Sequence, residues 1–126
     1  MSAEFEKGLV DVLAGVGVAR PRLPQPPTFP AIRYQRIHTT RQSAVDGTAT
    51  GPVESGLQID CIAETHLAAL TLADSVRSTL NRYTGAWGTL KCLFVSLQTE
   101  SDFSEQDGDN LTHMITQRYQ IWTNDV

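Results

Sequence analysis

The sequence predicts a single α+β domain, in which two helices pack on a mostly antiparallel four-stranded sheet in the order α-β-β-α-β-β. Three observations support this prediction. Residues 57–63 alternate apolar and polar side chains, as a half-buried strand does. Residues 66–83 then repeat apolar side chains at steps of three and four, the period of an amphipathic helix. Residues 111–123 alternate again, and the whole chain of 126 residues is long enough to bury one core.

The N-terminal segment predicts a helix over about residues 3–14, followed by a stiff connector. Ser2 is a candidate helix cap, and an apolar stripe runs along the helix from Phe5 to Leu13. Residues 20–30 hold five prolines, and proline fixes φ and donates no backbone hydrogen bond, so this connector is expected to be extended. A docking peptide for a partner groove is the alternative, but the PxxP pairs lack a basic residue at either usual flanking offset.

The first strand is expected over residues 31–39, with a bulge near Gln35 and Arg36 where the apolar alternation breaks. The next segment, residues 40–56, is polar, contains three glycines and shows no periodicity. We expect a long loop there between the first two strands, and loops of that length are often functional or disordered. The alternative is an extended hairpin arm that orders only against a partner.

The central block predicts a strand, a helix cap and a helix in direct succession. After the alternating strand 57–63, Thr65 is placed to accept a hydrogen bond from the first helical turn, and the helix begins at His66. Residues 84–88 are expected to form a turn, and residues 90–98 a third strand.

Charge is unevenly distributed along this chain, whose formal net charge is −4 at pH 7. Basic residues gather between residues 20 and 41, and acidic residues gather in a second long loop expected over residues 99–110. Runs of like charge are most often solvated surface. The sharper hypothesis is that the opposite patches meet on neighbouring copies of the chain and set their register. The candidate interface residues are Arg33, Arg36, Arg41, Asp46, Glu100, Asp102, Glu105, Asp107 and Asp109.

No pattern of reactive side chains indicates an enzyme. His38, His66 and His113 lack the close spacing of a metal motif, and the chain has neither a CxxC nor an HExxH pattern. We therefore expect no catalytic residue, no metal site and no cofactor. Cys61 and Cys92 fall in expected strands and are predicted to be small buried side chains. No apolar run approaches the roughly 20 residues that cross a bilayer, so no membrane partner is expected.

The aromatic residues leave a second class of function open. Tyr34, Phe94, Tyr119 and Trp122 fall on expected strands, as stacking of bases on a nucleic-acid-binding sheet requires. Core packing is the alternative reading. It is favoured because the last two expected strands carry no cluster of basic residues.

Several ordered segments resemble a known family of phage proteins. They are Pro30–Ile37, Gln58–Cys61, the helix from Ala69 to Leu80, and Arg118–Trp122. In this order, over nearly the whole chain, they resemble the small tail-completion proteins of long-tailed bacteriophages, which are similar in fold to tail terminators and tail-to-head joining proteins. The connector and the segment 40–56 depart in composition from the plainest members.

The resemblance implies a structural protein of the virion, located in the tail or neck and in the host cytoplasm during assembly. It implies a homo-oligomeric ring, usually of six subunits, at the head-proximal end of the tail. The partners would be further copies of the chain, the tail tube protein and the head-tail connector or head-closure protein. Phage DNA would pass through the lumen without specific binding, and an acidic lumen would repel this polyanion. The alternatives are another neck or head-closure adaptor, and the small nucleic-acid-binding module.

Overall fold

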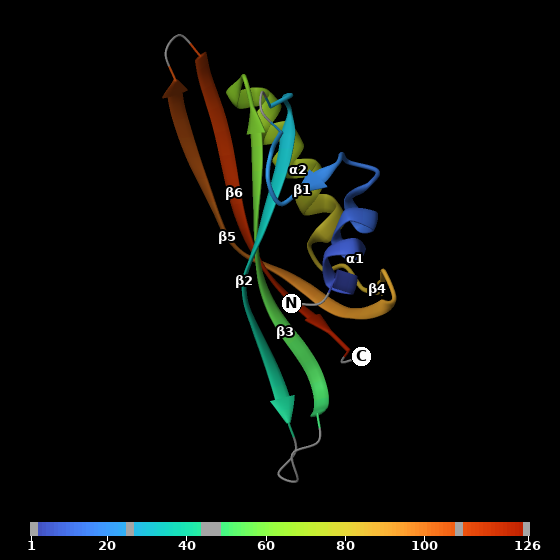
Figure 1. The fold of residues 1–126 in the computed structure, drawn as a ribbon. Helices are drawn as coiled ribbons and strands as arrows, with labels where there is room; N and C mark the ends of the chain where they lie inside the picture. The colour runs from blue at the N-terminus through green and yellow to red at the C-terminus, as the bar shows by residue number, and fades with distance from the viewer. Residues whose placement is uncertain (1–2, 25–26, 44–48, 108–109, 125–126) are drawn as a thin grey trace.

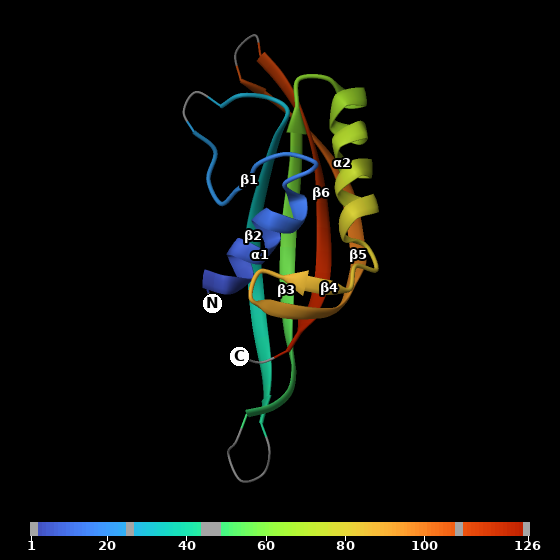
Figure 2. The same ribbon diagram turned by 90° about the vertical axis from the view of Figure 1, so that its right-hand side faces the viewer.

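The computed structural model describes residues 3–24, 27–43, 49–107 and 110–124. Figures 1 and 2 show a strongly twisted sheet with both helices on one side. The elements of the described residues are α1 (Ala3–Leu13), β1 (Ala19–Arg20), β2 (Ala31–Ser43), β3 (Ala49–Ala63), α2 (His66–Leu80), β4 (Gly85–Trp87), β5 (Leu90–Asp107) and β6 (Asn110–Thr123).

The described strands form one sheet in the order β1-β2-β3-β6-β5-β4. Strand β1 runs parallel to β2, and all other neighbours are antiparallel. The expected four-stranded, mostly antiparallel sheet in the order α-β-β-α-β-β is therefore wrong, because the described sheet is six-stranded and mixed. The sequence prediction missed β1 and β4, since strands of two and three residues are too short to show a period of two.

Two segments that we expected to be long loops are mostly strand. Strands β2 and β3 pair across most of the segment 40–56, and β5 and β6 pair across most of the segment 99–110. Both therefore belong to hairpins, which project at opposite ends of the sheet (Figure 1). Residues 37–40 and 98–104 are exposed on these hairpins, so the sequence there has no need of apolar alternation. The described part of the segment 40–56 pairs within one chain, so the hairpin of the alternative prediction is present without a partner.

The central block has the predicted local structure. The Thr65 hydroxyl accepts a hydrogen bond of 3.1 Å from the backbone N–H of Ala68, which caps α2. Helix α2 ends at Leu80, three residues before the predicted end at residue 83. The bulge predicted in β2 is a register shift between Arg36 and His38. The core side chains of β3 and α2 are Leu57, Ile59, Cys61, Ala63, Ala69, Ala73, Val76 and Leu80.

Helix α1 is held against β4 by a close contact between Gly8 and Trp87. Trp87 is fully buried, and its Nε1 donates a hydrogen bond of 2.8 Å to the carbonyl oxygen of Phe5. A Cβ on Gly8 would overlap both the ring and the backbone of Trp87, so only glycine allows this approach. The turn expected over residues 84–88 is thus corrected, because residues 85–87 form a strand that carries a large core side chain.

Cys61 and Cys92 are free and fully buried, which confirms the prediction for both side chains. Burial raises the pKa of the Cys61 thiol to about 12, and the charges of Asp60 and Glu100 act in the same direction. Burial likewise raises the pKa of the Cys92 thiol to about 11. Both groups are therefore neutral thiols in the folded protein at ordinary pH.

Candidate assembly interface

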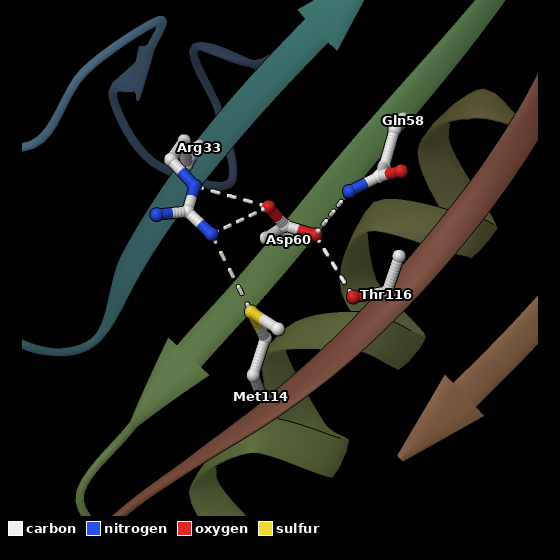
Figure 3. Close-up of polar contacts among 5 residues, drawn as sticks. All are labelled: Arg33, Gln58, Asp60, Met114 and Thr116. Atoms are coloured by element: carbon white, nitrogen blue, oxygen red, sulfur yellow. Dashed lines mark hydrogen bonds and ion pairs between the residues drawn. The ribbon is translucent and has the colours of Figure 1, made fainter. Parts of the chain in front are cut away.

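The sheet face opposite the helices carries a polar cluster around Asp60 (Figure 3). Asp60 is 3% exposed, and its Oδ2 accepts hydrogen bonds from Arg33 Nε at 3.0 Å and Nη2 at 2.9 Å. Its Oδ1 accepts hydrogen bonds from Gln58 Nε2 at 3.2 Å and from Thr116 Oγ1 at 2.9 Å. Arg33 neutralises the charge of Asp60 within the same chain. Its main structural role is therefore to link β2 to β3.

Arg36 lies on the other side of the sheet, against α1. Its guanidinium carbon is 5.1 Å from the centroid of the Phe5 ring, a cation–π distance. Next to it, the Tyr34 hydroxyl donates a hydrogen bond of 3.1 Å to Glu6 Oε1 of α1. Burial raises the pKa of Tyr34, and the Glu6 carboxylate acts in the same direction. These contacts join the edge of β2 to the N-terminal helix and leave Arg36 partly exposed.

Glu100 is the exposed end of a buried hydrogen-bond chain. Gln117 is fully buried, and its Nε2 donates to Glu100 Oε2 at 2.7 Å and to the carbonyl oxygen of Ala73 at 3.0 Å. The Tyr119 hydroxyl donates to Gln117 Oε1 at 2.7 Å, and burial raises the pKa of Tyr119. This series of hydrogen bonds links α2 to β5 and β6. Sequence reasoning missed it, because a buried amide shows its partners only in the folded chain.

The other predicted interface residues are divided between the two hairpins. Asp102 is exposed on β5, on the helix side of the sheet. The backbones of three further candidates belong to strands, namely Arg41 in β2 and Glu105 and Asp107 in β5. Two candidates, Asp46 and Asp109, lie outside the described residues. The β2–β3 hairpin, which holds Arg41, and the β5–β6 hairpin, which holds the acidic candidates, lie at opposite ends of the sheet (Figure 1). The structure therefore does not bring their charges together within one subunit.

The outer edge of β2 is covered only at its start. Strand β1 pairs with Ile32 and Arg33 and then ends. From Tyr34 to Ser43, a segment that we call the open half of β2, the only paired strand among the described residues is β3. The segment carries exposed residues at 35 and 37–40.

The outer edge of β5 is covered over its first half. Strand β4 pairs with residues 90–92. The turn after α2 continues the cover, because Arg82 N–H donates to the Val95 carbonyl at 2.7 Å and Leu97 N–H donates to Asn81 Oδ1 at 3.1 Å. From Gln98 to Asp107, the open half of β5, the paired strand in the described chain is β6 alone. Sequence reasoning did not locate either open half, since it assigned no strand order.

The aromatic residues do not form one base-stacking surface. Tyr34 and Tyr119 are buried on the helix side of the sheet, at 7% and 2% exposure. Phe94 and Trp122 lie on the opposite face, with ring centroids 6.3 Å apart. The core therefore accounts for two of the four residues on which the nucleic-acid alternative depended.

The described ranges contain no group of three or more His, Cys, Asp or Glu side chains that could hold a metal ion. His66 and His113 meet edge-on at 5.7 Å between ring centroids, and His113 Nδ1 lies 3.2 Å from the Ser104 hydroxyl. Within the same ranges, neither helix has the length and apolar character needed to span a bilayer.

Comparison with known proteins gives three findings. The family model described as "Tail completion protein gp17" matches residues 7–124. Among solved structures, the chain is similar to a chain of the "Virion of native gene transfer agent (GTA) particle", with a TM-score of 0.68 over 90% of this chain and 84% of that one. The two are 14% identical in sequence, so this likeness shows the fold. No curated protein matches the sequence.

Proposed function

This chain belongs to the tail completion protein gp17 family, and from that membership we propose that it is the subunit of a ring that closes the head-proximal end of a phage tail. As a member of this family it is a structural protein of the virion tail. We further propose that the ring has six subunits and that it lies where the tail joins the head.

The observation that carries the proposal is the extent of the family match, from residue 7 to residue 124. It includes the described strands, α2 and most of α1, so nearly the whole described fold corresponds to the family. A ring subunit needs a rigid core and exposed elements that contact neighbours. The buried network around Gln117 and the two projecting hairpins supply both.

The proposed partners are further copies of the chain, the tail tube protein and the head-tail connector or head-closure protein. Phage DNA would pass through the ring without specific binding. The acidic residues of the β5–β6 hairpin, among them Glu105 and Asp107, would give the lumen a negative charge that repels it. Normal DNA delivery by particles in which both residues are replaced by their amides would contradict this role of the hairpin. No catalytic role is part of the proposal.

Particles assembled without the chain test the proposal directly. We expect separate heads and tails in electron micrographs, with tails of uneven length, because nothing closes the tail tube. Supplying the intact chain from a second gene copy should restore joined particles. Joined particles of normal tail length in the absence of the chain would contradict the proposal.

The alternative role is a neck or head-closure adaptor, which would reach the particle on the head rather than the tail. Mass spectrometry of tails purified from cells that make no heads separates the two. We expect the chain on these headless tails. Its presence only on tail-less heads would favour the adaptor.

A further inference from the structure

We infer that the open half of β5 in one copy pairs with the open half of β2 in the next copy, in an antiparallel ladder that joins the two sheets. The inference deepens the proposed function and rests on it for the existence of a ring. It names the occupant of both open edges as a second copy of this chain.

Unpaired strand edges need a partner or a cover. Each edge presents a row of backbone N–H and C=O groups, and natural sheets cover or block such rows because they pair with other chains. In this chain β1 covers the start of β2, and β4 and the turn after α2 cover the first half of β5. The open halves, Tyr34–Ser43 and Gln98–Asp107, lack such a cover in the described chain and extend over about 30 Å each.

Charge selects which edges meet. The open half of β2 holds Arg36 and Arg41 and no acidic residue. The open half of β5 holds no basic residue, and its acids are Glu100, Asp102, Glu105 and Asp107. Two-fold pairing of β2 with β2, or of β5 with β5, would place like charges side by side, which destabilises a ladder. Pairing of β2 with β5 places opposite charges together and makes a head-to-tail contact, the kind that generates rings.

Strand direction is compatible with this pairing. Strands β2, β3, β6 and β5 are neighbours in the sheet, and each is antiparallel to the next. β2 and β5 therefore run in opposite directions within one subunit. Rotation about the axis of a ring preserves the sense of a strand along that axis, so β5 meets the neighbouring β2 as an antiparallel partner.

The limits of the two open halves also set the register of the ladder between copies. Matching the middles of the open halves brings Thr39 of one copy opposite Asp102 of the next, and this register puts Arg41 opposite Glu100. Thr39 and Asp102 both lie on the helix side of the sheet and are exposed. Within one chain the ladder row of Asp102 passes through Ile115 and Cys61 to Ile32.

This register requires tilted strands. From Ile32 to Thr39 there are about six ladder positions, or about 20 Å, because one residue is the bulge. Four strands from β2 to the next β2 span about 19 Å across the sheet. The strands would thus tilt by about 45° to the ring axis, close to the roughly 35–45° of closed barrels.

Charge substitution at the paired positions Thr39 and Asp102 tests the inference in the full chain. Thr39→Glu and Asp102→Lys should each raise the concentration at which the oligomer forms by about fivefold to tenfold in low salt. Thr39→Glu places an acid opposite Asp102, and Asp102→Lys removes an acid and places a base diagonal to Arg41. The double variant Thr39→Glu/Asp102→Lys should recover assembly. Thr39→Lys is the matched control, which places the same size of change beside an acid and should not weaken assembly. Sedimentation velocity gives the oligomer mass for all four.

Cysteine crosslinking gives an independent readout, both in solution and in assembled particles. The variant Thr39→Cys/Asp102→Cys should form a reducible ladder of crosslinked chains on a denaturing gel, whereas Thr39→Cys alone should not. The native Cys61 and Cys92 are buried and do not compete.

Oligomers of unchanged mass in both single charge variants, or the absence of a crosslinked ladder in solution and in particles, would overturn the edge pairing and leave the proposed function standing. Joined heads and tails made without the chain would overturn the proposed function instead.

Discussion

Trp87 of β4 lies directly on Gly8 of α1, with no room for a Cβ between them. The two residues are 79 positions apart in sequence, and their contact joins the N-terminal helix to the far end of the sheet from β2. Because the Trp87 indole N–H is also bound to the backbone of α1, the helix position is fixed by packing and by a directed hydrogen bond together.

Gly8→Ala should therefore lower the free energy of unfolding by about 2 kcal/mol, as overpacking of a filled core does. The clash is with the Trp87 backbone as well as its ring, so a rotamer change does not relieve it. Gly15→Ala is the control, since no atom lies within 4 Å of the added Cβ, and its effect should stay within about 0.5 kcal/mol. Urea unfolding of both variants measures the difference. Equal stabilities would show that α1 is not held by this contact.

The hydrogen bond between Tyr119 and Gln117 predicts that substitutions at these two residues have non-additive effects on the free energy of unfolding. Tyr119→Phe leaves Gln117 Oε1 without its donor, and Gln117→Leu leaves the Tyr119 hydroxyl buried without its acceptor. Each should cost about 1–3 kcal/mol of stability. The double variant should cost about 1 kcal/mol less than the sum, which a double-mutant cycle measures. Strict additivity would mean that the two side chains do not interact.

The ion pairs Arg33–Asp60 and Arg77–Asp74 offer a matched comparison, since both have an N–O distance of 2.9 Å. Arg33→Met should lower the free energy of unfolding by about 2 kcal/mol, because the nearly buried Asp60 loses its counter-charge. Arg77→Met breaks an exposed pair with Asp74 and should cost about 0.5 kcal/mol or less. Chemical denaturation at pH 7 gives both values. Equal losses would indicate that the burial of Asp60 has no energetic consequence.

The raised thiol pKa values predict a loss of stability in alkali. The folded protein keeps Cys92 protonated up to a pKa of about 11, whereas the unfolded chain ionises near its ordinary value of 9.0. This contribution to stability is complete below pH 9 and is lost as the pH rises toward 11. In Cys92→Ala the decline over this window should be shallower, by about 1–2 kcal/mol in total. Identical pH slopes in urea titrations would contradict the burial of this thiol.

The part of the fold that could be predicted is the part whose signals are local. Thr65 followed by an apolar repeat marks a helix start whatever the rest of the chain does, and the cap forms as expected. Strand β3 alternates over Leu57–Ala63 because α2 covers one of its faces there. The same strand was missed over its first half, because the buried positions there include Ser55 and Gly56, which give no apolar alternation.

The sequence shows which candidate interface residues are charged, but it does not show where they lie in the sheet or which residues they contact. Arg33 and Glu100 were both chosen for their charge, and each has a partner within the chain, in Asp60 and Gln117. Such partners come from strands distant in sequence, so no local pattern reveals them. The edge positions depend on the strand order, which β1 and β4 determine with two and three residues.

The two buried thiols have a consequence for the life of the particle outside the cell. A virion passes from the reducing interior of its host to an oxidising medium and must wait there unchanged. Oxidation and disulfide exchange need an accessible thiolate, and Cys61 and Cys92 are neither accessible nor ionised in the folded chain. Both thiols therefore keep the same chemical state before and after release, and exposure to air does not crosslink the chain through them.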